Sequence, residues 1–192
     1  MVRGDLGMIS TRSQKNKVPA GVTWCADNEC FNGKKYSDAT YYEWLRSWDA
    51  EARSRCLFAT APDIVGDAPG TLARSTPWLG MLRALGFPVG FVGQDGVEDM
   101  LYDIPWDDID VWFTGGSTEW KLSPEAAMCA NVARAHGLRT HMGRVNTKNR
   151  IVYAYNQGYD SVDGTTLTFG PDRNLPPLLR WLEEVHQAPP TG

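Results

Sequence analysis

The chain has 192 residues, of which 42% are hydrophobic and 22% are charged, and its formal net charge is −4. A chain of this length buries roughly 70% of its unfolded surface, so we expect one domain over residues 1–187 and a short flexible tail over residues 188–192. No apolar run approaches the ~20 residues that a membrane span needs, and the first five residues lack the apolar core of a signal peptide. The composition therefore argues against a membrane protein and against a broadly basic nucleic-acid binder, and it favours a cytoplasmic location.

The four cysteines, Cys25, Cys30, Cys56 and Cys129, are scattered along the chain. Their spacing fits neither a disulfide framework nor a Cys-x-x-Cys metal site. We expect buried thiols and no bound metal.

Helical patterns alternate with short apolar runs from one end of the chain to the other. Three helical segments end in a glycine directly before an apolar run, at Gly86, Gly137 and Gly158, and glycine suits the left-handed position that closes a helix. In chain order, strands are expected near 6–10, 23–27, 56–61, 89–93, 110–114, 139–143 and 159–162. Helices are expected near 39–52, 71–85, 98–102, 124–136, 148–157 and 175–186.

This alternation predicts an α/β fold with a parallel sheet. Seven strands in a ring would form a compact, trimmed TIM-type (β/α) barrel. Such barrels normally need eight strands and about 250 residues, so an open or incomplete barrel is the alternative.

Polar and small residues stand where the expected strands end. They are Asp27 and Asn28, Asp63 and Asp67, Gln94 and Asp95, Gly115 and Gly116, Arg144, and Asp163. The carboxyl ends of parallel strands converge at one face of a barrel, which is where such folds carry their active sites. A single aspartate could merely cap a helix or hold a turn, but successive strand ends with this character predict a functional site.

The order of these motifs resembles the tRNA-guanine transglycosylase superfamily. The segment 141–150 (HMGRVNTKNR) followed by 158–165 (GYDSVDGT) is similar to the end of that family's barrel, where a Met-Gly strand and a helix lead to Gly-x-Asp-x-x-Asp. The last aspartate of that motif is the nucleophile, which corresponds to Asp163. The longer string through Phe169-Gly170-Pro171 looks more like the phage branch, which inserts 7-deazaguanine bases into DNA.

The resemblance implies roles for the other strand ends. Asp27 corresponds to the acid/base partner, Phe31 to the aromatic that stacks on the base, and Asn32 to the amide that bonds its edge. Asp63 corresponds to the residue that reads the guanine N1 and 2-amino groups, with Asp67 as the second choice. Gln94 corresponds to the contact with the base carbonyl, and Gly115, Gly116 and Ser117 correspond to the turn where the backbone approaches the base.

Three departures from the family pattern stand out. Glu29-Cys30 replaces a Gly-Gly, so the loop after Asp27 takes a different path. Gly164-Thr165-Thr166 replaces the Pro-Thr-Arg that usually follows the nucleophile. The family's zinc-binding segment is absent, so the resemblance implies neither zinc nor any other cofactor.

The chemistry of base exchange asks for such residues independently. Exchange at C1′ passes through an oxocarbenium-like transition state, which one carboxylate can trap as a covalent intermediate. A second carboxylate must handle the proton of the departing and entering bases. We therefore expect a DNA-guanine transglycosylase whose partners are DNA and a free 7-deazaguanine such as 7-cyano-7-deazaguanine, located in the host cytoplasm if the chain is phage-encoded.

Three alternatives stay open: exchange in tRNA, a non-catalytic nucleic-acid-binding barrel, and a small retaining glycosidase built on two carboxylates. The oligomeric state is also open, a homodimer included.

Basic residues crowd the segments that should follow strands, in spite of the acidic total. If the strands are parallel, these loops meet on one rim that could hold phosphates; ordinary solvated charge is the alternative. The expected nucleic-acid contacts are Arg12, Lys15, Lys17, Lys121, Arg144, Lys148 and Arg150.

Overall fold

The computed structural model describes residues 6–31 and 36–187. The expected tail, 188–192, and Asn32 lie outside these ranges. Seven strands form one sheet, and each strand pairs in parallel with the next along the chain. The strands are β1 (Met8–Thr11), β2 (Trp24–Asp27), β3 (Cys56–Thr60), β4 (Val89–Gly93), β5 (Val111–Thr114), β6 (Arg139–Met142) and β7 (Ser161–Val162).

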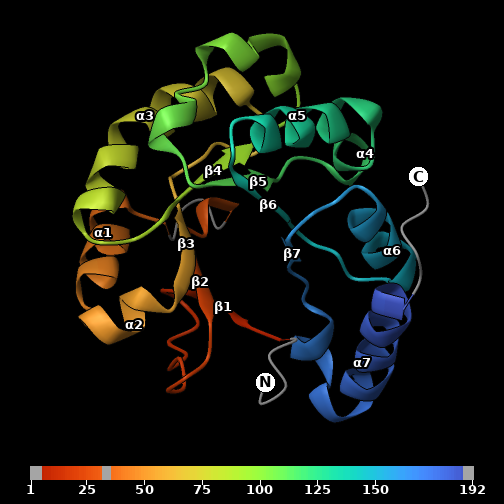
Figure 1. Ribbon diagram of the computed structural model, residues 1–192. Coiled ribbons are helices and arrows are strands. Elements are labelled where there is room, and N and C mark those ends of the chain that lie inside the picture. Colours follow the sequence, from red (N-terminus) through yellow and green to blue (C-terminus); the bar gives the residue numbers. More distant parts are fainter. Residues whose placement is uncertain (1–5, 32–35, 188–192) are drawn as a thin grey trace.

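The sheet curls into a half-barrel with helices on its outer side (Figure 1). The α-helices are α1 (Asp38–Arg46), α2 (Ala50–Ser54), α3 (Ala68–Ala84), α4 (Thr118–Lys121), α5 (Pro124–Ala135), α6 (Lys148–Asn156) and α7 (Pro171–Gln187). The 3-10 segments η2 (Val97–Asp103), η3 (Trp106–Asp108) and η4 (Thr166–Phe169) lie in connections between these elements.

The strand order ends at β1 on one side and at β7 on the other, and these two strands do not pair. The expected α/β fold with a parallel sheet is confirmed, whereas the sheet is an open half-barrel and not a closed ring. The amphipathic helix α7 packs against α6 and η4 on the β7 side of the opening.

Side chains alternate between the two faces of the strands, as β geometry requires, except in β3, where a register shift against β2 brings both Leu57 and Phe58 into the inner-face cluster. The outer face carries Trp24, Ala59, Phe91 and Trp112, which belong to the large core shared with the helices. The inner face carries a smaller apolar cluster of Cys25, Phe58 and Val111, with Ile9, Leu57 and Phe113 packed against it. The inner-face positions that lie closer to the carboxyl ends of the strands than this cluster can therefore carry polar side chains.

The helices differ from expectation mainly between residues 39 and 54. The expected single helix is two, because Ser47 ends α1 and the Asp49 side chain caps α2 by accepting a hydrogen bond from the Ala52 N–H at 2.7 Å. A side-chain oxygen at the N-cap satisfies a backbone donor that a continuous helix would use internally. Within the described ranges, no helix combines the length and apolar character that crossing a membrane requires.

Candidate functional site

Asp163 lies on the inner side of the sheet, directly after β7. Its Oδ2 is 3.1 Å from His141 Nε2, and its Oδ1 accepts a hydrogen bond from the Arg144 backbone N–H at 3.1 Å. Burial alone would raise the pKa of this carboxyl. The hydrogen bond and charge of His141, the Arg144 N–H and the Lys121 ammonium outweigh burial, so the pKa of Asp163 lies below its ordinary value. Asp163 is held as a carboxylate.

His141 orients Asp163, and the residue-by-residue resemblance gave it no role. It pairs with Ser161 across β6 and β7, and its Nδ1 is 2.8 Å from the Ser161 hydroxyl. Its ring packs against Phe58 and Phe113, with ring centroids 5.0 Å and 4.7 Å away. With a proton on Nε2, the ring donates to Asp163, and Nδ1 accepts from the Ser161 hydroxyl in the neutral ring and donates to it in the charged ring. The sequence signal was its position inside the expected strand 139–143, where its side chain can face the pocket.

Asp27 ends β2 and lies two residues after the inner-face Cys25, so it points to the same side of the sheet. Its Oδ1 accepts a hydrogen bond from the Glu29 N–H at 2.9 Å. Burial raises its pKa to about 7, and the negative charges of Asp163, Asp63 and Glu29 act in the same direction. Near neutral pH Asp27 can therefore hold or release a proton, while Asp163 stays ionised.

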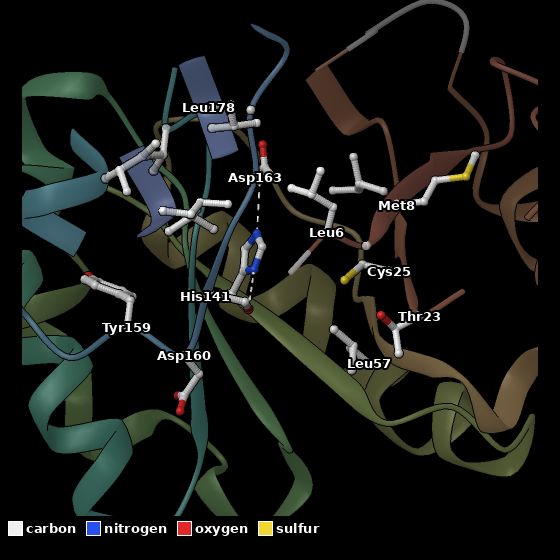
Figure 2. A pocket seen from close by; sticks show the side chains of 18 of the residues that line it. Leu6, Met8, Thr23, Cys25, Leu57, His141, Tyr159, Asp160, Asp163 and Leu178 are labelled. Carbon is white, nitrogen blue, oxygen red and sulfur yellow. Dashed lines mark hydrogen bonds and ion pairs between the residues drawn. The ribbon is translucent and has the colours of Figure 1, made fainter. Parts of the chain in front are cut away.

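A cavity of about 430 Å³ lies between the two edges of the sheet. Figure 2 shows it with Met8 and Cys25 on the β1–β2 side, and His141 and Asp163 on the β6–β7 side. Apolar side chains of α7, among them Leu178, line another wall. Ligand pockets typically have this size and a mainly apolar lining with a few polar groups. The cavity gives a small molecule access to Asp163.

Asp63 and Gln94, which follow β3 and β4, are brought together by the fold. The Gln94 Nε2 donates to Asp63 Oδ2 at 2.7 Å, and the Gln94 Oε1 accepts from the Gly116 N–H at 3.1 Å. Asn28 donates to the other Asp63 oxygen at 2.9 Å.

Asp63 is only 6% exposed, and burial raises its pKa despite these hydrogen bonds. Neither Asp63 nor Gln94 lines the 430 Å³ cavity. Asn28 belongs to this cluster, although only its place at a strand end marked it in the sequence.

The Gly115–Gly116 turn lies close against this cluster. Gly116 has a φ of +66°, and a Cβ there would meet Asp95 Oδ2 at 2.5 Å and the Trp120 ring at 2.7 Å. Both the backbone conformation and the space require glycine at this position. Ser117 caps α4 and donates from its hydroxyl to Asp95 at 2.6 Å. Asp67 caps α3 by accepting from the Gly70 N–H at 2.8 Å, so these two side chains have structural roles.

Phe31 is 67% exposed. Among the residues that the structure describes, no aromatic ring stacks on it. Its predicted partner in base contact, Asn32, lies outside the described residues.

The expected basic rim is only partly present. Lys121, which was expected to contact phosphate, is completely buried and donates to the Gly143 carbonyl at 2.8 Å, so it is not on the exposed rim. Lys148 forms an ion pair with Glu184 of α7. Arg144 donates to the Gly116 carbonyl at 2.7 Å, and Arg150 donates to the Arg144 carbonyl at 3.3 Å. Lys15 and Lys17 are exposed, and Arg12 is half-buried.

No cluster of three or more His, Cys, Asp or Glu side chains suited to a metal ion occurs among residues 6–31 and 36–187. All four thiols are free, and burial raises the pKa of each.

Comparison with known proteins adds no identification. No protein-family model matches the chain, and no curated protein matches it.

Proposed function

We propose that this protein is a base-exchange transglycosylase that replaces guanine in DNA with a 7-deazaguanine such as 7-cyano-7-deazaguanine. The observation that supports this best is the pair Asp163 and Asp27, whose environments move their pKa values in opposite directions. Two carboxyl groups with separated pKa values can divide the roles of nucleophile and acid/base catalyst.

In the first half-reaction, the Asp163 carboxylate attacks C1′ of the target nucleotide. The C1′–N9 bond breaks, and Asp27 gives its proton to the departing guanine. In the second half-reaction, the entering 7-deazaguanine returns its N9 proton to Asp27. N9 then attacks C1′, and the bond from C1′ to Asp163 breaks. Two inversions give overall retention at C1′.

Asp63 and Gln94 provide the matching recognition chemistry. Guanine presents two donors, N1–H and the 2-amino group, next to the acceptor O6. Asp63 can accept from the two donors, and Gln94 Nε2 can donate to O6. In the free protein these residues bond to each other at 2.7 Å, so an entering base would replace that hydrogen bond with its own. A base without this donor–acceptor pattern would leave the buried polar groups of Asp63 and Gln94 without hydrogen-bond partners, which makes the free energy of binding less favourable.

A base-exchange assay tests the proposal. The protein is incubated with duplex or single-stranded DNA and radiolabelled guanine, and parallel reactions contain tRNA. We expect label in DNA, no incorporation by Asp163→Ala or Asp163→Asn, and a DNA-linked protein band after denaturing quench of the wild type with DNA. Label in tRNA alone would move the proposal to the tRNA enzyme. Cleavage of aryl glycosides without exchange would indicate a glycosidase, and nucleic-acid binding without exchange would indicate a non-catalytic barrel.

Ser161→Ala separates the proposal from a serine-hydrolase mechanism. The contact of Ser161 with His141 brings a hydroxyl beside an imidazole that also contacts Asp163, which is the set of groups that a hydrolase uses. In the proposed reaction the serine only orients His141, so Ser161→Ala should retain exchange. Loss of exchange comparable to that of Asp163→Ala would contradict the assigned roles.

A further inference from the structure

Lys121, at the end of α4, is the most deeply buried cation among the described residues, with 0% exposure. Lysine is almost never fully buried unless it is paired. Its Nζ donates to the Gly143 carbonyl at 2.8 Å. Lys121 does not line the 430 Å³ cavity, so it is not placed to contact a ligand there.

The carbonyl that accepts from Lys121 belongs to the same peptide unit as the N–H that binds Asp163. Gly143 contributes the C=O, and Arg144 contributes the N–H that donates to Asp163 Oδ1 at 3.1 Å. A peptide unit is planar and conjugated, and hydrogen bonds in a chain polarise one another. A cation on the oxygen therefore makes the N–H a stronger donor to the carboxylate.

The backbone around this peptide is fixed by further contacts. Arg144 has a φ of +58°, which is uncommon for a residue with a side chain. Its guanidinium bonds to the Gly116 carbonyl, and the Val145 N–H donates to the Asp163 carbonyl at 2.6 Å. Lys121 is thus one of several groups that hold the turn at residues 143–145 against β7. Among these groups, it is the one that brings a full positive charge within hydrogen-bond distance of the Gly143 oxygen.

The charges around Lys121 agree with this arrangement. Burial, together with the charges of Arg144 and Arg150, lowers the pKa of Lys121 to about 8, and the charges of Asp163 and Asp95 oppose this shift. At neutral pH the ammonium form is present, and its charge contributes to the low pKa of Asp163.

We infer that Lys121 is a positioning residue that keeps the Asp163 carboxylate ionised and correctly directed, acting through the Gly143–Arg144 peptide. This inference concerns the state of Asp163 and holds whether or not the protein exchanges bases.

The test is a carbon-13 NMR titration of the Asp163 carboxyl in the wild type and in Lys121→Met, which shortens the unbranched side chain by one atom and removes the charge. We expect the Asp163 midpoint to rise by about one pH unit or more in the variant. Lys121→Gln retains a donor but no charge, and it should recover only part of this shift. Lys148→Met, which removes an exposed lysine paired with Glu184, is the control and should leave the midpoint unchanged.

The wild type provides an independent measurement that does not require a Lys121 variant to fold. As Lys121 loses its proton near pH 8, the Asp163 carboxyl resonance should show a second step, distinguishable from the Asp27 step by repeating the titration in Asp27→Asn. Absence of this step, or an unchanged midpoint in a folded Lys121→Met protein, would overturn the inference. If the titration gives the expected result but the protein does not exchange bases, the proposed function is wrong and the role of Lys121 stands.

Discussion

Replacing Asp27 with asparagine should stabilise the protein, and the gain should grow with pH. The folded state keeps a proton on Asp27 between pH 3.8 and about 7, whereas the unfolded chain releases it near 3.8. The folded state therefore binds more protons in this window, and ionisation of Asp27 makes the free energy of unfolding fall as the pH rises. Asparagine has nearly the same shape, carries no charge and can still accept the hydrogen bond from the Glu29 N–H.

The size of the effect follows from the shift. A rise in pKa from 3.8 to about 7 corresponds to about 4 kcal/mol of lost stability once the pH exceeds both values. The stability difference between Asp27→Asn and the wild type should therefore be near zero at pH 4 and should approach a few kcal/mol at pH 8, as an order of magnitude.

Urea unfolding followed by circular dichroism, at intervals between pH 4 and pH 8, measures this difference. Asp107→Asn removes an exposed carboxyl from η3 and is the matched control, with a change over the same range below about 0.5 kcal/mol. If the difference for Asp27→Asn is also constant with pH, the pKa of Asp27 is not raised, and the division of roles between Asp27 and Asp163 fails.

Three further outcomes are expected. Asp63→Ala should reduce the preference for guanine over adenine, since each lost charge-assisted hydrogen bond is worth about 1.5–3 kcal/mol; a preference equal to that of the wild type, measured in competition, would assign recognition to other residues. Gly116→Ala should lower the free energy of unfolding by about 2 kcal/mol more than Gly66→Ala does. Both glycines have a positive φ, but only at Gly116 would a Cβ meet Asp95 and Trp120. Equal losses of stability in thermal melts would show that the turn can relax. DNA affinity should fall steeply with salt, and charge reversal of Lys15 and Lys17 should reduce the slope of log affinity against log salt by about 0.9 for each phosphate contact removed; an unchanged slope would mean that DNA approaches by another face.

The sequence by itself predicted the parallel α/β sheet, because glycine-closed helices alternate with short apolar strands at a spacing that only βα units satisfy. It also predicted where the polar strand ends would gather, since the carboxyl ends of parallel strands meet at one edge. Asp27, Asp63, Gln94 and Asp163 were selected as candidates in this way. The break between α1 and α2 was missed because the Asp49 cap competes with a continuous helical pattern, and local propensity alone does not decide between them.

Only the tertiary structure decided how these residues interact. His141 reaches Asp163 because β6 and β7 pair in a register that places it opposite Ser161, and no local pattern fixes that register. Lys121 looked like a surface cation in the sequence, yet as the last residue of α4 it donates to the Gly143 carbonyl and is fully buried. The gap between β1 and β7, and the cavity within it, depend on how far the whole sheet curls, which is a property of all seven strands together and of no single segment.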